Sequence, residues 1–168
     1  MLTGFQLRAT KAVLELTAKE IAAAIGVHPG TIIRLGFTKN REYLRCSAKN
    51  IILLRKFFET KDIFFPDENT LSLKSKIKPI PITGQLTRFQ LKTARIASAL
   101  TQEELSSYIR VSSSTISILE RLNDQEYIKS TKMNTFLLKK YFEHLGIIFP
   151  NDLSVSLIKD PTVLSKKN

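Results

Sequence analysis

The stretch LTQEELSSYIRVSSSTISILE, Leu100 to Glu120, decides the fold that we expect for this chain. Thr101 is followed three residues later by Glu104, a capping box in which the Thr oxygen accepts a backbone N–H and the Glu reaches back to the cap. Apolar residues then recur at helical spacing until the helix ends near Arg110. Ser112 is a good N-cap for a second short helix. Two short helices joined by a turn of about four residues predict a helix-turn-helix.

The first turn of the second helix carries short, polar, uncharged side chains. Such side chains can approach base edges in the major groove of DNA without a clash. The residues predicted to read bases here are Ser112, Ser113, Ser114 and Ser117.

This stretch resembles the phage repressor/Cro-like (XRE) helix-turn-helix family, which fixes polar caps and apolar positions together over about twenty residues. The matching residues are Thr101, Gln102, Glu104, Leu105, Ile109, Val111, Ser112, Thr115, Ile116 and Glu120. The resemblance implies that Gln102 contacts DNA phosphate and that Arg95 pairs with Glu120. Arg110 stands where the family usually has Gly, and a non-Gly residue in a left-handed turn costs about 1 kcal/mol.

The chain contains two copies of one unit, aligned without a gap at an offset of 84 residues. LTGFQL at Leu2–Leu7 returns as LTRFQL at Leu86–Leu91, and Phe65-Pro66 returns as Phe149-Pro150. Roughly a third of the aligned positions are identical, which chance does not produce over this length.

We therefore predict a mainly α fold with short β-hairpins, made of two tandem repeats. Each repeat should be a lambda-repressor-like helical bundle with a helix-turn-helix, followed by a β-hairpin. The first helix should run from about Thr3 to Leu16, with Arg8 outward, and its equivalent from Thr87 to Leu100. Two strands alone are marginally stable, so each hairpin should pack on helices or join the other hairpin. The expected boundaries are 1–75 for the first unit, 76–84 for a Pro-stiffened linker, 85–160 for the second unit and 161–168 for a tail.

The two copies differ at positions that matter for function. In the first copy Ala18 replaces the Gln and Gly36 replaces the Glu, so Lys11 has no buried partner. Its turn keeps the expected Gly26. The residues predicted to read bases in the first copy are His28, Gly30, Ile33 and Arg34; an Arg can pair with guanine through two hydrogen bonds.

Charge favours a polyanionic partner. The net charge is +11 and the pI about 9.9, which suits DNA, RNA or an acidic membrane surface. Residues 1–78 hold 14 basic and 7 acidic residues, and residues 79–168 hold 12 and 8, so the first copy is the more basic. The residues predicted to contact phosphate are Lys39, Arg41, Arg45, Thr101, Gln102, Asn123 and Lys129.

Other classes of site are not indicated. His28, His144 and Cys46 are scattered, so no metal site is predicted, and no nucleophile stands at a useful spacing from a base. We expect no catalytic residues, no cofactor and no enzyme. The lone Cys excludes an internal disulfide and fits a reducing compartment. No signal peptide or membrane span is indicated, so the expected location is the cytoplasm, on the nucleoid when DNA is bound.

These patterns favour a sequence-specific double-stranded DNA-binding transcriptional regulator, and a repressor rather than an activator. Half-sites for helix-turn-helix pairs lie about 34–36 Å apart, and about ten extended linker residues reach ~33 Å. The alternative is an antitoxin-like or polymerase-docking module, with one unit on DNA and the other on a toxin or a polymerase subunit. A homodimer through the hairpins stays open, while RNA binding and a small recombinase are weaker alternatives.

Overall fold

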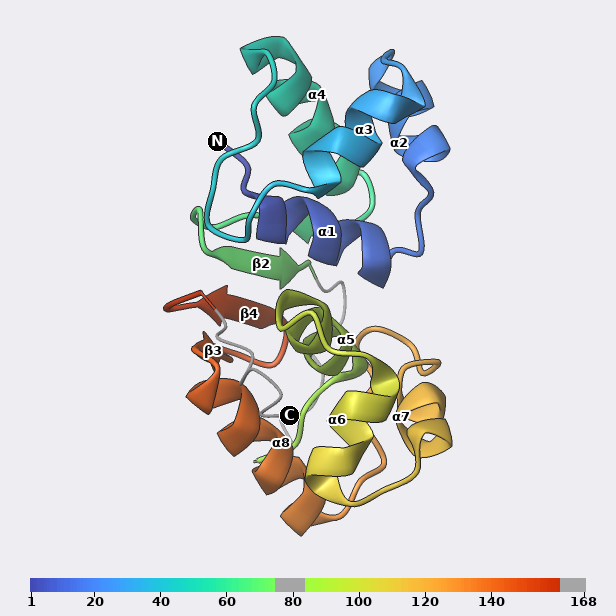
Figure 1. The fold of residues 1–168 in the computed structure, drawn as a ribbon, viewed down its shortest axis with the longest axis vertical. Coiled ribbons are helices and arrows are strands. Elements are labelled where there is room, and N and C mark those ends of the chain that lie inside the picture. Colours follow the sequence, from blue (N-terminus) through green and yellow to red (C-terminus); the bar gives the residue numbers. More distant parts are fainter. Residues whose placement is uncertain (75–83, 161–168) are drawn as a thin grey trace, which may run out of the picture.

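The computed structural model describes residues 1–74 and 84–160, which we call the first unit and the second unit (Figure 1). Residues 75–83, which include all of the predicted linker except Gly84, and the whole predicted tail, 161–168, lie outside the described residues.

The described chain is mainly α-helical with one small antiparallel sheet. The elements of the first unit are α1 (Gly4–Val13), α2 (Ala18–Ile25), α3 (Pro29–Gly36), α4 (Ala48–Glu59), β1 (Ile63–Phe64) and β2 (Thr70–Leu73). Those of the second unit are α5 (Arg88–Ala97), α6 (Gln102–Ile109), α7 (Ser113–Leu119), α8 (Lys132–His144), β3 (Ile147–Ile148) and β4 (Ser154–Leu157). Every element of the second unit begins 84 residues after its equivalent in the first.

Local sequence explains where the helices begin. Thr3, Thr17, Thr87 and Thr101 each form the N-cap of a capping box, with Gln or Glu three residues later. The longer helices are capped as well, α4 by Ser47 and α8 by Thr131. These bonds satisfy backbone N–H groups that the first helical turn leaves without a partner.

The first helix of each unit is shorter than the apolar spacing predicts. We expected it to reach Leu16 and Leu100, but α1 ends at Val13 and α5 at Ala97. The reason is a left-handed residue two positions beyond each helix, Glu15 with φ 55° and Ala99 with φ 53°. This conformation ends the helix and turns the chain toward α2 or α6.

The two hairpins join into one sheet with the order β1-β2-β4-β3. Leu71 on β2 pairs with Val155 on β4, which is its own equivalent in the repeat. On either side, Thr70 pairs with Ser156 and Ser72 with Ser154, and the hydroxyl oxygens of these pairs lie 2.5 and 2.7 Å apart. The units are therefore paired about an approximate two-fold axis through the Leu71–Val155 pair, as two subunits would be in a symmetric dimer.

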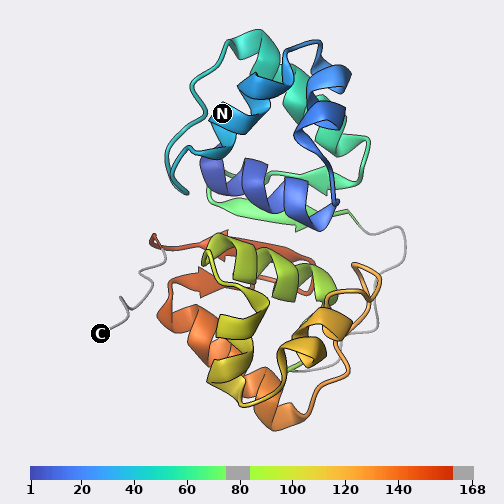
Figure 2. The same ribbon diagram turned by 45° about the vertical axis from the view of Figure 1, so that its right-hand side comes forward.

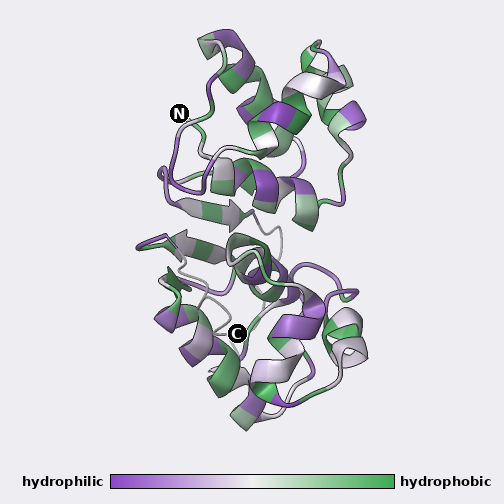
Figure 3. Ribbon diagram, viewed as in Figure 1, coloured by the Kyte–Doolittle hydropathy of each residue, from purple (hydrophilic) through white to green (hydrophobic). Residues whose placement is uncertain are grey.

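Two helices, α1 and α5, pack against each other beside this sheet, α1 on β2 and α5 on β4 (Figures 1 and 2). Hydrophobic and hydrophilic residues alternate along the helices, as expected where one face is buried (Figure 3). The largest buried side chains are Phe5, Phe58, Phe89 and Phe142, two from each unit at equivalent positions.

Polar contacts also hold the units together. Arg88, only 6% exposed, donates from Nη1 to the carbonyl of Val13 at 3.2 Å and from Nη2 to Glu15 at 3.2 Å. Lys92 Nζ lies 2.7 Å from the same Glu15 carboxylate. Asn40 donates to the carbonyl of Ala97 at 3.0 Å. The relative position of the two units is thus set by direct contacts between them.

Candidate functional site

The short helices α6 and α7 are joined by a tight turn that requires a left-handed residue. Arg110 occupies it with φ 55° and ψ 45° and donates its backbone N–H to the carbonyl of Ser106. In the first unit Gly26 has φ 70° and ψ 40° at the equivalent position between α2 and α3. The predicted strain at Arg110 is therefore present, because a side chain stands where Gly is favoured.

A buried ion pair fixes α7 against α5. Arg95 donates from Nε to Glu120 Oε1 at 2.5 Å and from Nη2 to Oε2 at 2.7 Å. Only 11% of the Arg95 side chain and 4% of the Glu120 side chain are exposed. Arg95 Nη1 also donates to the carbonyl of Leu100 at 2.8 Å, and Gln102 Nε2 donates to Glu120 Oε2 at 2.9 Å. The predicted pair is thus a three-residue cluster that ties α5, α6 and α7 together.

The serines at the start of α7 face solvent. Ser112, Ser113 and Ser114 are exposed and Ser117 is half-buried. Ser112 is the N-cap: its Oγ accepts the N–H of Thr115 at 3.2 Å and lies 2.7 Å from the Ser114 hydroxyl. Since the hydroxyls of Ser112 and Ser114 are engaged with each other, Ser113 is the residue of this turn that best presents its hydroxyl to a ligand, and Ser114 can do so only by exchanging its bond to Ser112.

The predicted phosphate contacts of the second unit are accessible, but three of them already have partners. Gln102 uses one amide N–H on Glu120, which leaves its second N–H and its oxygen. The Thr101 hydroxyl is engaged with Glu104 in the capping box. Asn123 is exposed, and Lys129 lies 3.8 Å from Glu126 in a solvent-exposed pair that is easily exchanged.

The equivalent face of the first unit has a different character. His28 caps α3 because its Nδ1 accepts the N–H of Gly30 at 3.1 Å, so Nε2 is the ring atom that points away from the cap bond. Gly30 and Arg34 are exposed, and Ile33 is 53% exposed. Phe37, just beyond α3, is 81% exposed. This face combines one cation with apolar surface, where the second unit offers hydroxyls.

The basic residues that follow α3 lie on a loop with a fixed backbone. Lys39, Arg41 and Arg45 are all exposed. The loop is held on the start of the chain by hydrogen bonds from Gly4 N to the Glu42 carbonyl at 3.0 Å and from Leu44 N to the Leu2 carbonyl at 2.9 Å. The structure therefore presents these three cations on one ordered loop.

Sequence reasoning missed an arginine that anchors the end of the second short helix in each unit. In the second unit Arg88 Nε donates to the carbonyl of Glu120 at 3.0 Å, and its Nη1 bonds Asp124. In the first unit Arg8, which we expected to point outward, donates to the carbonyl of Gly36 at 3.0 Å and to Asn40. Burial of the Arg8 guanidinium lowers its pKa.

These two arginines occupy different positions of the repeat. Arg8 aligns with Lys92, and Arg88 aligns with Gly4, one helical turn earlier. Gly4 is required in the first unit because a Cβ there would lie 2.2 Å from the carbonyl oxygen of Thr38. An alignment of the two copies shows only mismatches at these positions. It therefore gives no sign that both arginines bond the carbonyl at the end of the second short helix of their unit.

The described residues offer little to other kinds of chemistry. Among them, no group of three or more His, Cys, Asp or Glu could hold a metal ion. Within the same ranges, no helix is both long and apolar enough to cross a membrane.

Comparison with known proteins adds no relative: no protein-family model, curated protein or solved structure matches this chain.

Proposed function

We propose that this chain is a sequence-specific double-stranded DNA-binding transcriptional regulator, acting as a repressor by occupying its site. In this proposal α2–α3 and α6–α7 are two tandem helix-turn-helix repeats, and α3 and α7 are the recognition helices. The observation that carries the proposal is the first turn of α7, where exposed Ser113 and Ser114 project from a short helix locked to its neighbours by the Arg95–Glu120 pair. Short hydroxyl side chains on a rigid helix suit base edges in the major groove.

Charge supports a nucleic-acid partner of this kind. A net charge of +11 attracts a polyanion, and Lys39, Arg41 and Arg45 are held together on the loop after α3. Because each neutralised phosphate releases counterions, affinity should fall steeply as salt is raised.

The two-fold pairing of the sheet supports binding of the two repeats to one duplex. In Figure 1 the α2–α3 pair lies above the sheet and the α6–α7 pair below it, both on the right-hand side of the view. Symmetric dimers of helix-turn-helix proteins place two recognition helices on two half-sites in this way. Here the recognition residues differ between the units, so the preferred site should have two unlike halves.

A homodimer through the hairpins would have to use the outer strands. The paired edges of β2 and β4 are already joined within the chain. The outer strands β1 and β3 are two residues long, which gives a second chain few backbone groups to pair with. We therefore propose that one chain does the work of a dimer.

The test is a selection of bound sequences from random duplex DNA, repeated with two variants. Ser113→Ala combined with Ser114→Ala should relax the preference in one half of the selected motif, and Arg34→Ala should relax it in the other half. A mutated base-reading contact costs about 1–3 kcal/mol of discrimination. A wild-type protein that retains no preferred motif, at any salt concentration that permits binding, would exclude the proposal.

A second candidate function concerns the first unit alone. Ile33 and Phe37 are 53% and 81% exposed, and exposed apolar side chains favour a protein partner such as a toxin or a polymerase subunit. In that case the selected motif would be a single half-site, insensitive to Arg34→Ala and altered only by changes in α7.

A further inference from the structure

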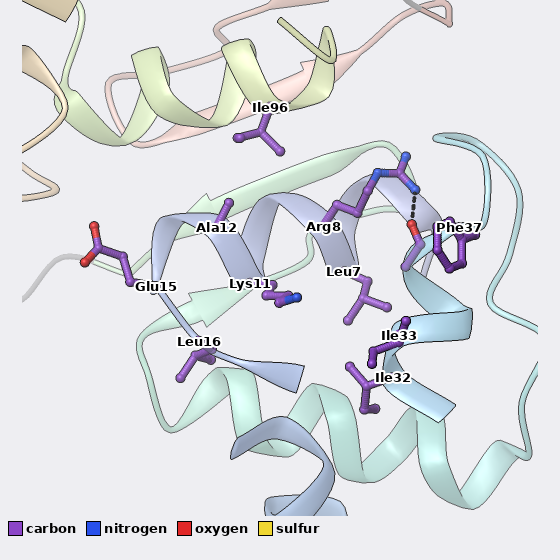
Figure 4. A pocket seen from close by; sticks show the side chains of 11 residues that line it. Leu7, Arg8, Lys11, Ala12, Glu15, Leu16, Ile32, Ile33, Phe37 and Ile96 are labelled. Carbon is purple, nitrogen blue, oxygen red and sulfur yellow. Dashed lines mark hydrogen bonds between the residues drawn. The ribbon is translucent and has the colours of Figure 1, made fainter. Parts of the chain in front are cut away.

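The first unit contains an open groove of about 560 Å³ between α1 and α3, closed on one side by Ile96 of α5 (Figure 4). Its walls are mainly apolar and include Leu7, Leu16, Ile32 and Ile33. A volume of several hundred Å³ with apolar walls is typical of sites for small molecules.

The groove lies where the second unit has its buried ion pair. Gly36 lines the groove and aligns with Glu120, and Lys11 lines it and aligns with Arg95. The repeat therefore keeps the cation on the first helix of the unit but lacks the carboxylate on the third. A Cβ built on Gly36 meets no atom within 4 Å, so the place of the missing side chain is open.

Lys11 is the charge in this groove that has no counter-ion among the described residues. Figure 4 shows it at the centre of the lining residues, and it forms no ion pair within the described part of the chain. The other charged residues of the wall are engaged elsewhere: Arg8 with the Gly36 carbonyl and Asn40, and Glu15 with Lys92 at 2.7 Å and Arg88 at 3.2 Å.

We propose that this groove binds a small organic carboxylate with an apolar body. Its carboxylate would pair with the Lys11 ammonium and take the place that the Glu120 carboxylate occupies in the second unit, while its hydrocarbon part would lie on Leu7, Leu16 and Ile32. A charged hydrogen bond in a partly desolvated groove favours the anion over neutral analogues of the same shape.

The position of the groove gives such a ligand a way to control DNA binding, which rests on the function proposed above. The pair Arg95–Glu120 fixes α7 against α5, whereas α3 is anchored at its end by Arg8 and has no equivalent of this pair among the described residues. A carboxylate bound to Lys11 would supply it from outside. Ligand binding would then shift the population of the protein toward the orientation of α3 in which Lys11 and the apolar wall contact the ligand best.

The probe is octanoate, followed by NMR amide shifts of the full-length protein without DNA. We expect saturable shifts centred on α1 and α3. Octanamide, which has the same chain and no charge, should bind at least about tenfold more weakly, since tenfold corresponds to the loss of one charged contact. Equal binding of octanoate and octanamide, shifts elsewhere in the protein, or no binding would overturn the proposal.

Variants of the groove sharpen the test. Lys11→Met removes the charge and keeps an unbranched side chain only one atom shorter, and it should weaken octanoate binding about tenfold, with octanamide unaffected. Gly36→Glu supplies the missing carboxylate within the chain and should abolish octanoate binding, whereas Gly36→Ala, which adds only the Cβ, should retain it. Octanoate that binds Gly36→Glu as tightly as wild type would overturn the proposal even if Lys11→Met failed to fold.

The control of DNA binding is tested separately, by titrating the selected duplex with and without octanoate. Octanoate should change wild-type affinity and leave the affinity of Gly36→Glu unchanged. A bound octanoate without effect on DNA affinity would overturn the regulatory role, and a protein that binds octanoate but selects no DNA would show that the proposed function, not the groove, had failed.

Discussion

The two units place different chemistry between the same pair of helices. Between α5 and α7 the second unit holds Arg95 and Glu120, with Gln102 donating to the Glu120 carboxylate. Between α1 and α3 the first unit has Lys11 and Gly36 at the equivalent positions, and a groove. Yet α3 and α7 begin at equivalent residues, and both units have the same order of elements.

The comparison shows that the ion pair is not needed to form the fold. Buried ion pairs often contribute little net stability, because removing both charges from water costs about as much as their attraction returns. What such a pair does supply is a definite geometry. The second unit thus holds α7 through both Arg88 and the ion pair, whereas the first unit anchors α3 through Arg8 and leaves the position of the ion pair open.

The largest effect should come from breaking the pair on one side only. Glu120→Ala leaves the Arg95 guanidinium buried and removes the partner of two of its hydrogen bonds, so we expect a loss of about 3–5 kcal/mol in the free energy of unfolding. Urea denaturation measures it. The matched change in the first unit, Lys11→Met, should cost less than about 1 kcal/mol, because Lys11 forms no ion pair with any residue that the structure describes. Similar losses in both variants would contradict the comparison.

A smaller loss of stability should come from adding a side chain at Gly4, at the start of α1. Gly4→Ala forces a Cβ to within 2.2 Å of the Thr38 carbonyl oxygen, whose backbone has to move. Overpacking of this kind typically costs about 1–3 kcal/mol. The residue at the equivalent position of the second unit, Arg88, is not a suitable control, because Arg88→Ala would also remove the hydrogen bond that anchors α7. The sharper control is Gly36→Ala, where no atom lies within 4 Å and helix propensity favours Ala. Thermal unfolding should shift down for Gly4→Ala and up for Gly36→Ala.

Exchanging the turn residues should give effects of opposite sign. Arg110 has φ 55° and Gly26 has φ 70° at equivalent turns. Arg110→Gly should stabilise the protein by about 1 kcal/mol, because it relieves a left-handed side chain, and Gly26→Arg should destabilise it by a similar amount. If both changes destabilise, the Arg110 side chain makes a compensating interaction.

The smallest effect concerns the contact between the units. The hydrogen bond from Lys92, and then its charge, lower the pKa of the Glu15 carboxyl. A carboxyl whose pKa is lowered by folding stabilises the folded state above its unfolded pKa, and this contribution is lost as the pH falls through the folded value. Because the Glu15 side chain is 71% exposed, Glu15→Gln should cost less than about 1 kcal/mol at neutral pH.

The pH dependence distinguishes this contact from a packing effect. Wild type and Glu15→Gln should differ near pH 7 and converge as the pH falls through the lowered pKa of the wild-type carboxyl, because that carboxyl is then protonated as well. Denaturation midpoints across this range measure it. A difference that persists at low pH would assign the role of Glu15 to packing rather than to charge.

Much of the local structure could be predicted from the sequence, because it rests on short-range patterns. The capping boxes at Thr17 and Thr101 and the left-handed turn at Arg110 involve residues a few positions apart, so spacing alone specifies them. The Arg95–Glu120 pair came from the resemblance. The repeat itself determined that each element would have an equivalent 84 residues away.

Tertiary structure decided what spans the repeat or departs from it. The joining of β2 to β4 about the Leu71–Val155 pair depends on which edges meet in space, and each hairpin could equally have packed on helices alone. The shared role of Arg8 and Arg88 is invisible in an alignment, because long side chains reach the same carbonyl from adjacent helical turns. The groove at Gly36 depends on tertiary structure for a similar reason. The sequence shows that Gly36 lacks the side chain of Glu120, but only the fold shows that the space of that side chain is left unfilled.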